Sequence, residues 1–171
     1  MNNYLHPKYT SVLNKIRKEG HPQLNAITIC FQFLSASAAM DGACESRLQA
    51  LGFSEGRFVL LMLLHEETEG LFPHQLAKQA GVTRATITGL LDNLERDQII
   101  ERHAYEDDRR KIRIFLTQKG ADMATKLFQI HTDWVATLFA DISQEEEHML
   151  TNIFERLSRK LQNKAIDETT V

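Results

Sequence analysis

This sequence of 171 residues contains little cysteine, little proline and no long apolar run. Its two cysteines, Cys30 and Cys44, form no C-x-x-C pair, so neither a disulfide framework nor a zinc site is indicated. The longest uninterrupted apolar run, residues 58–64, is much shorter than the ~20 residues of a membrane span. The polar residues 1–4 do not resemble a signal peptide. We therefore expect a cytoplasmic protein that makes no contact with a membrane.

Motifs of the common enzyme classes are also missing. The sequence contains no G-x-S-x-G, no phosphate-binding glycine loop, no H-E-x-x-H and no dinucleotide-binding fingerprint. Its histidines show no metal-ligand spacing. We therefore expect a protein that is not an enzyme and that holds neither a metal nor a cofactor.

The charge balance is uneven along the chain. A net charge of −3 by itself argues against a nucleic-acid-binding protein. However, residues 71–120 carry nine basic and seven acidic side chains, whereas residues 21–70 and 121–171 are both acidic. The positive charge is therefore concentrated in one segment, as expected if that segment contacts a polyanion.

Few prolines, and apolar residues at helical spacing, predict a mainly α-helical chain. The caps and breaks place the expected helices at residues 8–18, 23–50, 54–65, 73–80, 83–97, 117–141 and 143–163. Apolar and polar residues nearly alternate in residues 112–116. These residues and 99–105 are expected to pair as a β-hairpin around a charged tip at 106–111.

Ala77, Gly81 and Ile87 have the spacing of a helix-turn-helix. Two steeply crossing helices need a small side chain at their contact, a residue that tolerates positive φ in the turn, and a branched apolar side chain on the second helix. The hairpin follows directly, which is the order of a winged helix-turn-helix: one helix enters a major groove and the wing can reach a minor groove. The alternative is a merely solvated hairpin tip, in which Arg109, Arg110, Lys111 and Arg113 are balanced by Glu106, Asp107 and Asp108.

Residues 21–163 resemble the multiple-antibiotic-resistance-regulator (MarR) family of bacterial regulators, most closely over 71–120. The matching pieces are Gln75-Leu76-Ala77, the run from Gly81 to Thr88, Leu91-Asp92-Asn93-Leu94-Glu95 and Ile100-Glu101-Arg102. The most specific piece is similar to the family's wing signature and consists of Asp108-Arg109-Arg110 followed by Ile114, Leu116, Thr117 and Gly120. The resemblance implies that Arg110 contacts a minor groove and that Asp108 holds the wing arginine in place.

The start of the second helix of the motif also presents polar side chains. They lie off its apolar face, where they can meet phosphates or base edges, and Arg84 is the best candidate for base reading. The candidate DNA-binding residues are Thr83, Arg84, Thr86, Thr88, Asp108, Arg109, Arg110, Lys111 and Arg113.

The terminal segments carry apolar stripes outside the winged domain, for example Met149, Leu150, Ile153, Phe154, Leu157 and Leu161. Such a stripe is either intramolecular core or a dimer interface. We favour a homodimer, which the resemblance also implies, and hence a pseudo-palindromic operator. The expected division is dimerisation helices in residues 1–53, a winged helix-turn-helix DNA-binding domain in 54–117 and dimerisation helices in 118–171.

The resemblance further implies release from DNA by a small aromatic or lipophilic effector or by thiol oxidation. Trp134, with His131 and Phe33, is a candidate effector site, and a role in the core is the alternative. Cys30 lies near the reactive cysteine of peroxide-sensing relatives, but the tyrosines that support that thiolate are not evident, so packing is favoured.

These observations favour a transcription regulator that binds double-stranded DNA as a homodimer, most simply a repressor, since repression is the family's common mode. Two alternatives stay open. One is a thiol-based sensor of oxidative stress in the same family, and the other is a winged-helix protein-interaction module that does not bind DNA.

Overall fold

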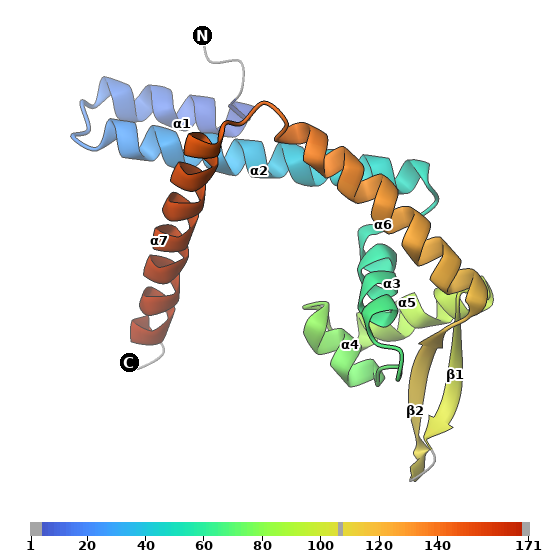
Figure 1. Cartoon of the computed structure of the whole chain (residues 1–171). Coiled ribbons are helices and arrows are strands. Elements are labelled where there is room, and N and C mark those ends of the chain that lie inside the picture. Colours follow the sequence, from blue (N-terminus) through green and yellow to red (C-terminus); the bar gives the residue numbers. More distant parts are fainter. Residues whose placement is uncertain (1–4, 106–107, 169–171) are drawn as a thin grey trace. The chain divides into compact units, whose positions relative to one another are not determined.

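The computed structural model describes residues 5–105 and 108–168, without the side chains of residues 108–110 and 164–168. Within these residues the chain forms seven helices and one two-stranded antiparallel sheet (Figure 1). The elements are α1 (Pro7–Lys18), α2 (Leu24–Ala50), α3 (Glu55–Glu66), α4 (Pro73–Gln79), α5 (Arg84–Arg96), β1 (Ile100–Tyr105), β2 (Asp108–Leu116), α6 (Gln118–Leu138) and α7 (Gln144–Glu168). The predicted fold class, mainly α-helical with a small hairpin, is confirmed.

The chain divides into two compact units, Met1–Thr125 and Lys126–Val171. The first unit contains α1 to α5, the hairpin and the beginning of α6. The second contains the rest of α6 and α7. The functional division at residues 53 and 117 remains a prediction.

In the first unit, α1 folds back along α2 (Figure 1). The ring of Tyr9 stacks on that of Phe31 with centroids 4.7 Å apart, and Leu13 is buried between the helices. The backbone N–H of His6 donates to Ser35 Oγ at 3.0 Å, and that hydroxyl donates to the Phe31 carbonyl at 2.7 Å. The buried hydroxyl is thereby satisfied, which a buried polar group requires.

α2 is a long apolar helix whose side chains are mostly exposed. Its length and a mean hydropathy of 1.3 over 18 residues would allow it to cross a membrane, although only 6% of that window is buried. Uninterrupted apolar runs do not reveal this helix, because polar residues such as Gln32 and Ser35 divide the segment. Length and composition of a single helix are weak evidence, so they assign it no membrane role.

The core of the first unit is assembled from α3, α4, α5 and the base of the hairpin. Its fully buried side chains include Leu60, Leu61, Leu76, Leu94 and Ile114, each 0% exposed. Burying a leucine or isoleucine side chain contributes about 1.5–3 kcal/mol. This core therefore fixes α5 and the hairpin on one scaffold.

The helix-turn-helix has the predicted geometry. Ala77 and Ile87 are 6% and 2% exposed, and Gly81 lies between them with a φ of +66°. The backbone N–H of Val82 donates to the Ala77 carbonyl at 3.0 Å, which closes the turn after α4. A positive φ favours glycine, so Gly81 suits this turn.

The wing differs from the prediction at its tip. β2 begins at Asp108, so most of the residues expected in a tip at 106–111 belong to the strand. Tyr105 pairs with Asp108 after a register shift at Ala104 and Tyr105. The run of charged residues hid this strand, because it carries no alternation of apolar and polar side chains. A separate bridge joins Leu71 to Ile114 through two backbone hydrogen bonds of 3.0 and 2.9 Å.

Two arginines connect the elements around α5. Arg57 of α3 donates to Asp97 at 2.5 Å. Arg102 of β1 donates to Asp92 of α5 at 2.6 Å and lies 3.4 Å from a Glu95 carboxylate oxygen. These ion pairs bind α3 and β1 to the helix that carries the candidate site.

In the second unit, α7 begins with the predicted capping box. Ser143 Oγ accepts from the backbone N–H of Glu146 at 3.4 Å, and Glu146 Oε2 accepts from the Ser143 backbone N–H at 2.9 Å. The hydrogen bonds from the hydroxyl and the backbone N–H of Ser143 lower the pKa of Glu146 from its ordinary value. The predicted C-terminal ends of these two helices, residues 141 and 163, were wrong. α6 stops at Leu138 and α7 continues to Glu168.

Candidate nucleic-acid interface

The N-terminus of α5 presents four exposed polar residues, Thr83, Arg84, Thr86 and Thr88. Thr83 caps the helix, since its Oγ1 accepts from the Thr86 N–H at 3.2 Å, and the two threonine hydroxyls share a hydrogen bond of 2.9 Å. The buried side chains Ile87, Leu91 and Leu94 hold the opposite face of α5 against the core. The four candidates therefore lie on the outer face of a fixed helix.

The hydroxyl of Thr88 is committed to its own helix. It donates to the Arg84 carbonyl at 3.0 Å. A hydroxyl has one hydrogen and two lone pairs, so in this rotamer Thr88 can only accept from a ligand. Arg84 has donors only and is suited to phosphate oxygens or to guanine.

Arg84 and Lys111 line the same open pocket between α5, the start of α4 and β2. The pocket volume is about 500 Å³. Its lining combines basic and apolar groups: Phe72, Pro73, His74, Arg84, Ile87, Thr88, Lys111 and Ile112. The structure thus brings a cation of the wing beside the first residue of α5.

Arg113 occupies a different position. Its Nη1 donates to the Glu69 carbonyl at 2.9 Å, and its guanidinium carbon lies 5.0 Å from the ring centre of Phe72 and 4.9 Å from that of Tyr105. The side chain is half-buried, and its residue pairs with His103 in the middle of the hairpin. Arg113 is thus not among the residues that line the pocket of Arg84 and Lys111, but it packs against Phe72, which does line it.

Three predicted wing contacts fall on side chains outside the described part of the chain. Asp108, Arg109 and Arg110 have a described backbone in β2, and nothing further is described of them. Their roles remain predictions.

A sequence model of the MarR family matches residues 53–112, from just before α3 to the middle of β2. The HTH-type transcriptional repressor YetL of Bacillus subtilis is 34% identical over 157 residues, which span 89% of this chain and 94% of YetL. The chain belongs to the MarR family.

The fold of this MarR-family chain is similar to solved structures of the same kind. MepR, a transcription regulator of the Staphylococcus aureus multidrug efflux pump MepA, gives a TM-score of 0.66 at 27% identity over 76% of this chain and 96% of MepR. A MepR–DNA complex gives 0.62 at 29% identity over 74% and 94% of the two chains. This MarR-family chain is accordingly a winged helix-turn-helix transcription regulator, and the named relatives are regulators as well.

The candidate effector residues lie in both units. Phe33 is exposed on α2 in the first unit. In the second unit the rings of His131 and Trp134 are 5.7 Å apart, and both residues are half-buried. Their part in an effector site remains a prediction.

The two cysteines of this MarR-family chain lie on α2. Cys30 is exposed and Cys44 is half-buried. Exposure makes Cys30 accessible to oxidants, but reactivity also requires a stabilised thiolate.

The sequence analysis missed Phe72, His74 and Tyr105 as neighbours of the site. They are aromatic residues from the start of α4 and the end of β1, and their rings form contacts of 5.7 Å (Phe72–His74) and 5.4 Å (Phe72–Tyr105). The sequence holds one indirect signal, since aromatic residues flank Pro73 at the helix start.

Proposed function

We propose that this chain is a repressor that binds double-stranded DNA as a homodimer and is released by a small-molecule effector. The observation that carries the proposal is the exposed outer face of α5, where Arg84 shares a pocket with Lys111 of the wing. This arrangement suits a DNA duplex. The N-terminus of α5 can enter a major groove while the wing follows the phosphates, and cations lie where the two meet. The similarity to a MepR–DNA complex supports this assignment.

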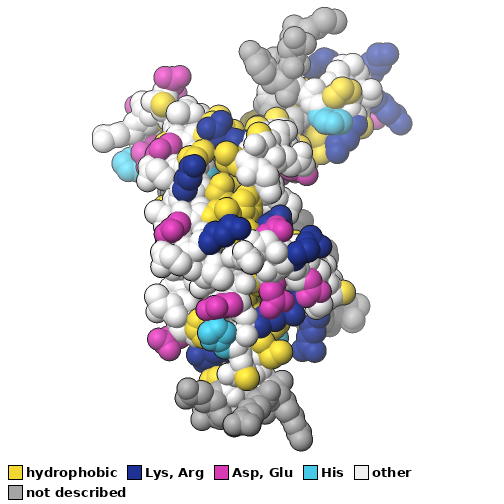
Figure 2. Space-filling view, turned by 90° about the vertical axis from the view of Figure 1, so that its right-hand side faces the viewer, with side chains coloured by type: hydrophobic (Ala, Val, Ile, Leu, Met, Phe, Trp, Pro, Cys, Tyr) yellow, Lys and Arg dark blue, Asp and Glu magenta, His cyan; other side chains and the backbone are white. Residues whose placement is uncertain are grey.

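The proposed dimer interface includes the outer face of α7. Its exposed large apolar side chains are Met149, Ile153, Phe154, Leu157 and Leu161. Hydrophobic side chains also lie at the surface among charges of both signs on the different face that Figure 2 draws. Contiguous exposed apolar surface of this kind marks an interaction site. The family relationship favours a second copy of this chain as the partner that covers this face of α7.

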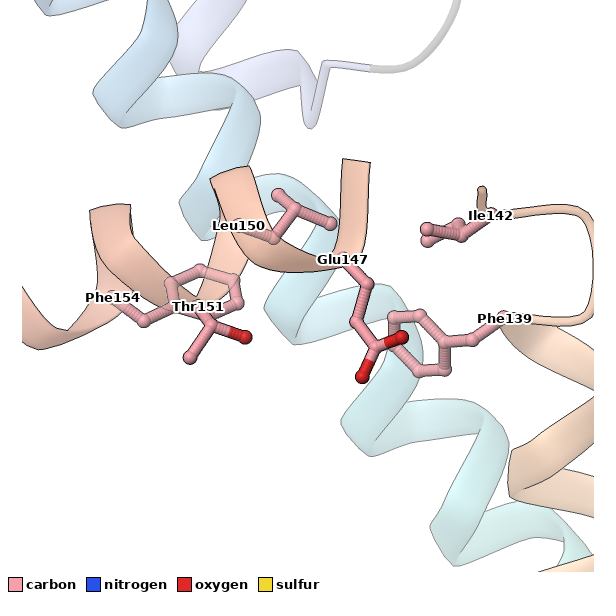
Figure 3. A pocket seen from close by; sticks show the side chains of 6 residues that line it. All are labelled: Phe139, Ile142, Glu147, Leu150, Thr151 and Phe154. Carbon is pink, nitrogen blue, oxygen red and sulfur yellow. The ribbon is translucent and has the colours of Figure 1, made fainter. Parts of the chain in front are cut away.

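An open pocket in the second unit has the same character (Figure 3). Its volume is about 330 Å³, and Phe139, Ile142, Leu150 and Phe154 supply its apolar lining beside Glu147 and Thr151. We assign this pocket to the dimer interface and the terminal segments 1–53 and 118–171 to dimerisation. Dimerisation also explains the exposed apolar residues of α2, such as Ile29 and Leu34, better than membrane insertion does.

The direct test is binding of the purified protein to a fluorescent duplex from its own upstream region, with a scrambled duplex as the control. Selective binding supports the proposal. If the protein binds neither duplex, the alternative of a winged-helix protein-interaction module is favoured instead. Aromatic carboxylic acids titrated into the complex then test release, and the fluorescence of the single tryptophan, Trp134, reports effector binding at its predicted site.

Arg110→Ala is expected to weaken binding to operator and scrambled duplexes alike. The minor groove offers a degenerate pattern and a negative potential, so a wing arginine contributes mostly affinity. The slope of log K against log salt concentration should fall by about one unit. Asp108→Ala should reproduce part of the loss of affinity, because Arg110 then keeps its charge but is no longer held in place. Unchanged affinities and slope for Arg110→Ala would exclude Arg110 as a DNA contact.

Cys30→Ser is expected to leave the response of DNA binding to organic peroxide unaltered. The exposure of Cys30 favours the thiol-sensor alternative, but no supporting tyrosines are evident in the sequence. The measurement is binding of parent and variant before and after peroxide treatment, with Cys44→Ser as the matched control. Peroxide-induced release that disappears only in Cys30→Ser would establish thiolate chemistry as the switch.

A further inference from the structure

Arg113, Phe72 and Tyr105 form a cluster that joins both strands of the wing to the start of α4, and we call it the Arg113 clamp. The guanidinium carbon lies 5.0 and 4.9 Å from the two ring centres, and the rings meet edge to face at 5.4 Å. The same guanidinium donates to the Glu69 carbonyl at 2.9 Å. One side chain of β2 thus contacts β1, the loop before α4 and the N-cap of α4.

The backbone beside the clamp makes a shorter connection. Leu71 and Ile114 exchange two hydrogen bonds, and Gly70 packs so closely that a Cβ there would lie 2.7 Å from the Ile114 carbonyl oxygen. This bridge fixes β2 at one residue pair. A two-stranded ribbon twists readily, so one pair does not by itself set the direction of the wing.

The ion pairs of Arg102 hold β1 against α5, and the clamp adds a further constraint, from the start of α4. It acts through Tyr105 at the far end of β1 and through Phe72 at the start of α4. A guanidinium stacks on aromatic rings while its edge donates hydrogen bonds, which an ammonium cannot do in the same way. The clamp therefore fixes the wing relative to the helix-turn-helix at both of its strands.

We propose that Arg113 is a positioning residue for DNA recognition: it sets the separation between the wing and α5 and makes no phosphate contact. The proposal rests on the proposed function of DNA binding. Specific binding needs α5 and the wing to engage one duplex at a fixed spacing, whereas non-specific binding depends on the number of cations near phosphates.

The test compares Arg113→Ala with Lys111→Ala on operator and scrambled duplexes across a salt series. Arg113→Ala should weaken operator binding by about tenfold and change scrambled binding little, with an unchanged salt slope. Lys111→Ala, on the same strand, should weaken both and lower the slope by about one unit. If Arg113→Ala lowered both affinities and the slope, a phosphate contact would replace the proposal. Equal losses at an unchanged slope would indicate a merely structural role.

Two further measurements complete the test. Tyr105→Leu should reproduce part of the effect of Arg113→Ala, and the loss in the double variant should be smaller than the sum of the two single losses, because the contact between the two side chains is removed in both. Amide hydrogen exchange without DNA should accelerate in β1 and β2 and stay unchanged in α5. If the parent binds no duplex, the proposed function fails, but unaltered exchange in the wing of Arg113→Ala would separately overturn the clamp.

Discussion

Gly120→Ala is expected to lower the free energy of unfolding by about 3 kcal/mol or more, a loss typical of severe local strain. A Cβ on Gly120 would lie 2.0 Å from the Ile99 carbonyl oxygen and 3.2 Å from Leu116 Cδ2. The carbonyl cannot easily move away, because it accepts hydrogen bonds from the backbone N–H and the hydroxyl of Thr117 at 3.1 and 3.2 Å. The close approach joins α6 to the base of the wing, so the substitution strains both.

The measurement for Gly120 is denaturant unfolding of parent and variant, with Gly89→Ala as the matched control. Gly89 lies in α5, and among the described residues no atom beyond its chain neighbours and its own helix backbone lies within 4 Å of an added Cβ. Alanine there should therefore stabilise the protein by about 0.5–1 kcal/mol. Stability of Gly120→Ala within about 0.5 kcal/mol of the parent would show that the backbone at Ile99 relaxes without cost.

Replacing Ile153 and Leu157 together with glutamate is expected to abolish the proposed dimer. Both side chains are exposed on the apolar face of α7, and each contributes about 1.5–3 kcal/mol when a partner buries it. Two buried charges would add a desolvation cost. The combined loss of about 3–6 kcal/mol raises the dissociation constant by more than a hundredfold.

Sedimentation equilibrium measures the association state of this double variant, and circular dichroism separates dissociation from unfolding. The control replaces Glu155 and Arg159 with glutamine, because both lie on the opposite side of α7 at 100° per residue. We expect the control to stay dimeric. If the glutamate variant fails to fold, alanine at Ile153 and Leu157 is the milder substitution to test, and it should also weaken the dimer. An unchanged dimer in the folded double variant would move the interface away from α7.

The features that the sequence predicted correctly depend on residues close together in the chain. The caps Ser54, Thr83 and Ser143 each bond within three residues, and the turn at Gly81 needs one backbone conformation. Local preferences decide such features, so a pattern of a few residues is sufficient. The end of α7 was predicted too early because residues 164–168 continue the helix without extending its apolar stripe.

The candidate site was only partly predictable, for the opposite reason. Arg113 bonds to Glu69 across 44 positions, and Arg57 bonds to Asp97 across 40. No local pattern distinguishes Arg113 from Lys111, two residues away, yet one lies in the clamp and the other lines the pocket with Arg84. Sequence reasoning could name basic residues of the wing, but the packing of α4 against the hairpin assigns them different surroundings.

The free edge of the wing has a consequence for solubility. Among the described residues β1 pairs only with β2, so one row of its backbone groups faces away from the sheet. An exposed strand edge can template pairing with a strand of another chain, and charged residues oppose this. β1 carries Glu101, Arg102 and His103 in succession, and the ion pairs of Arg102 bind the strand to α5. The ribbon can thus project into solvent with little tendency to seed aggregation.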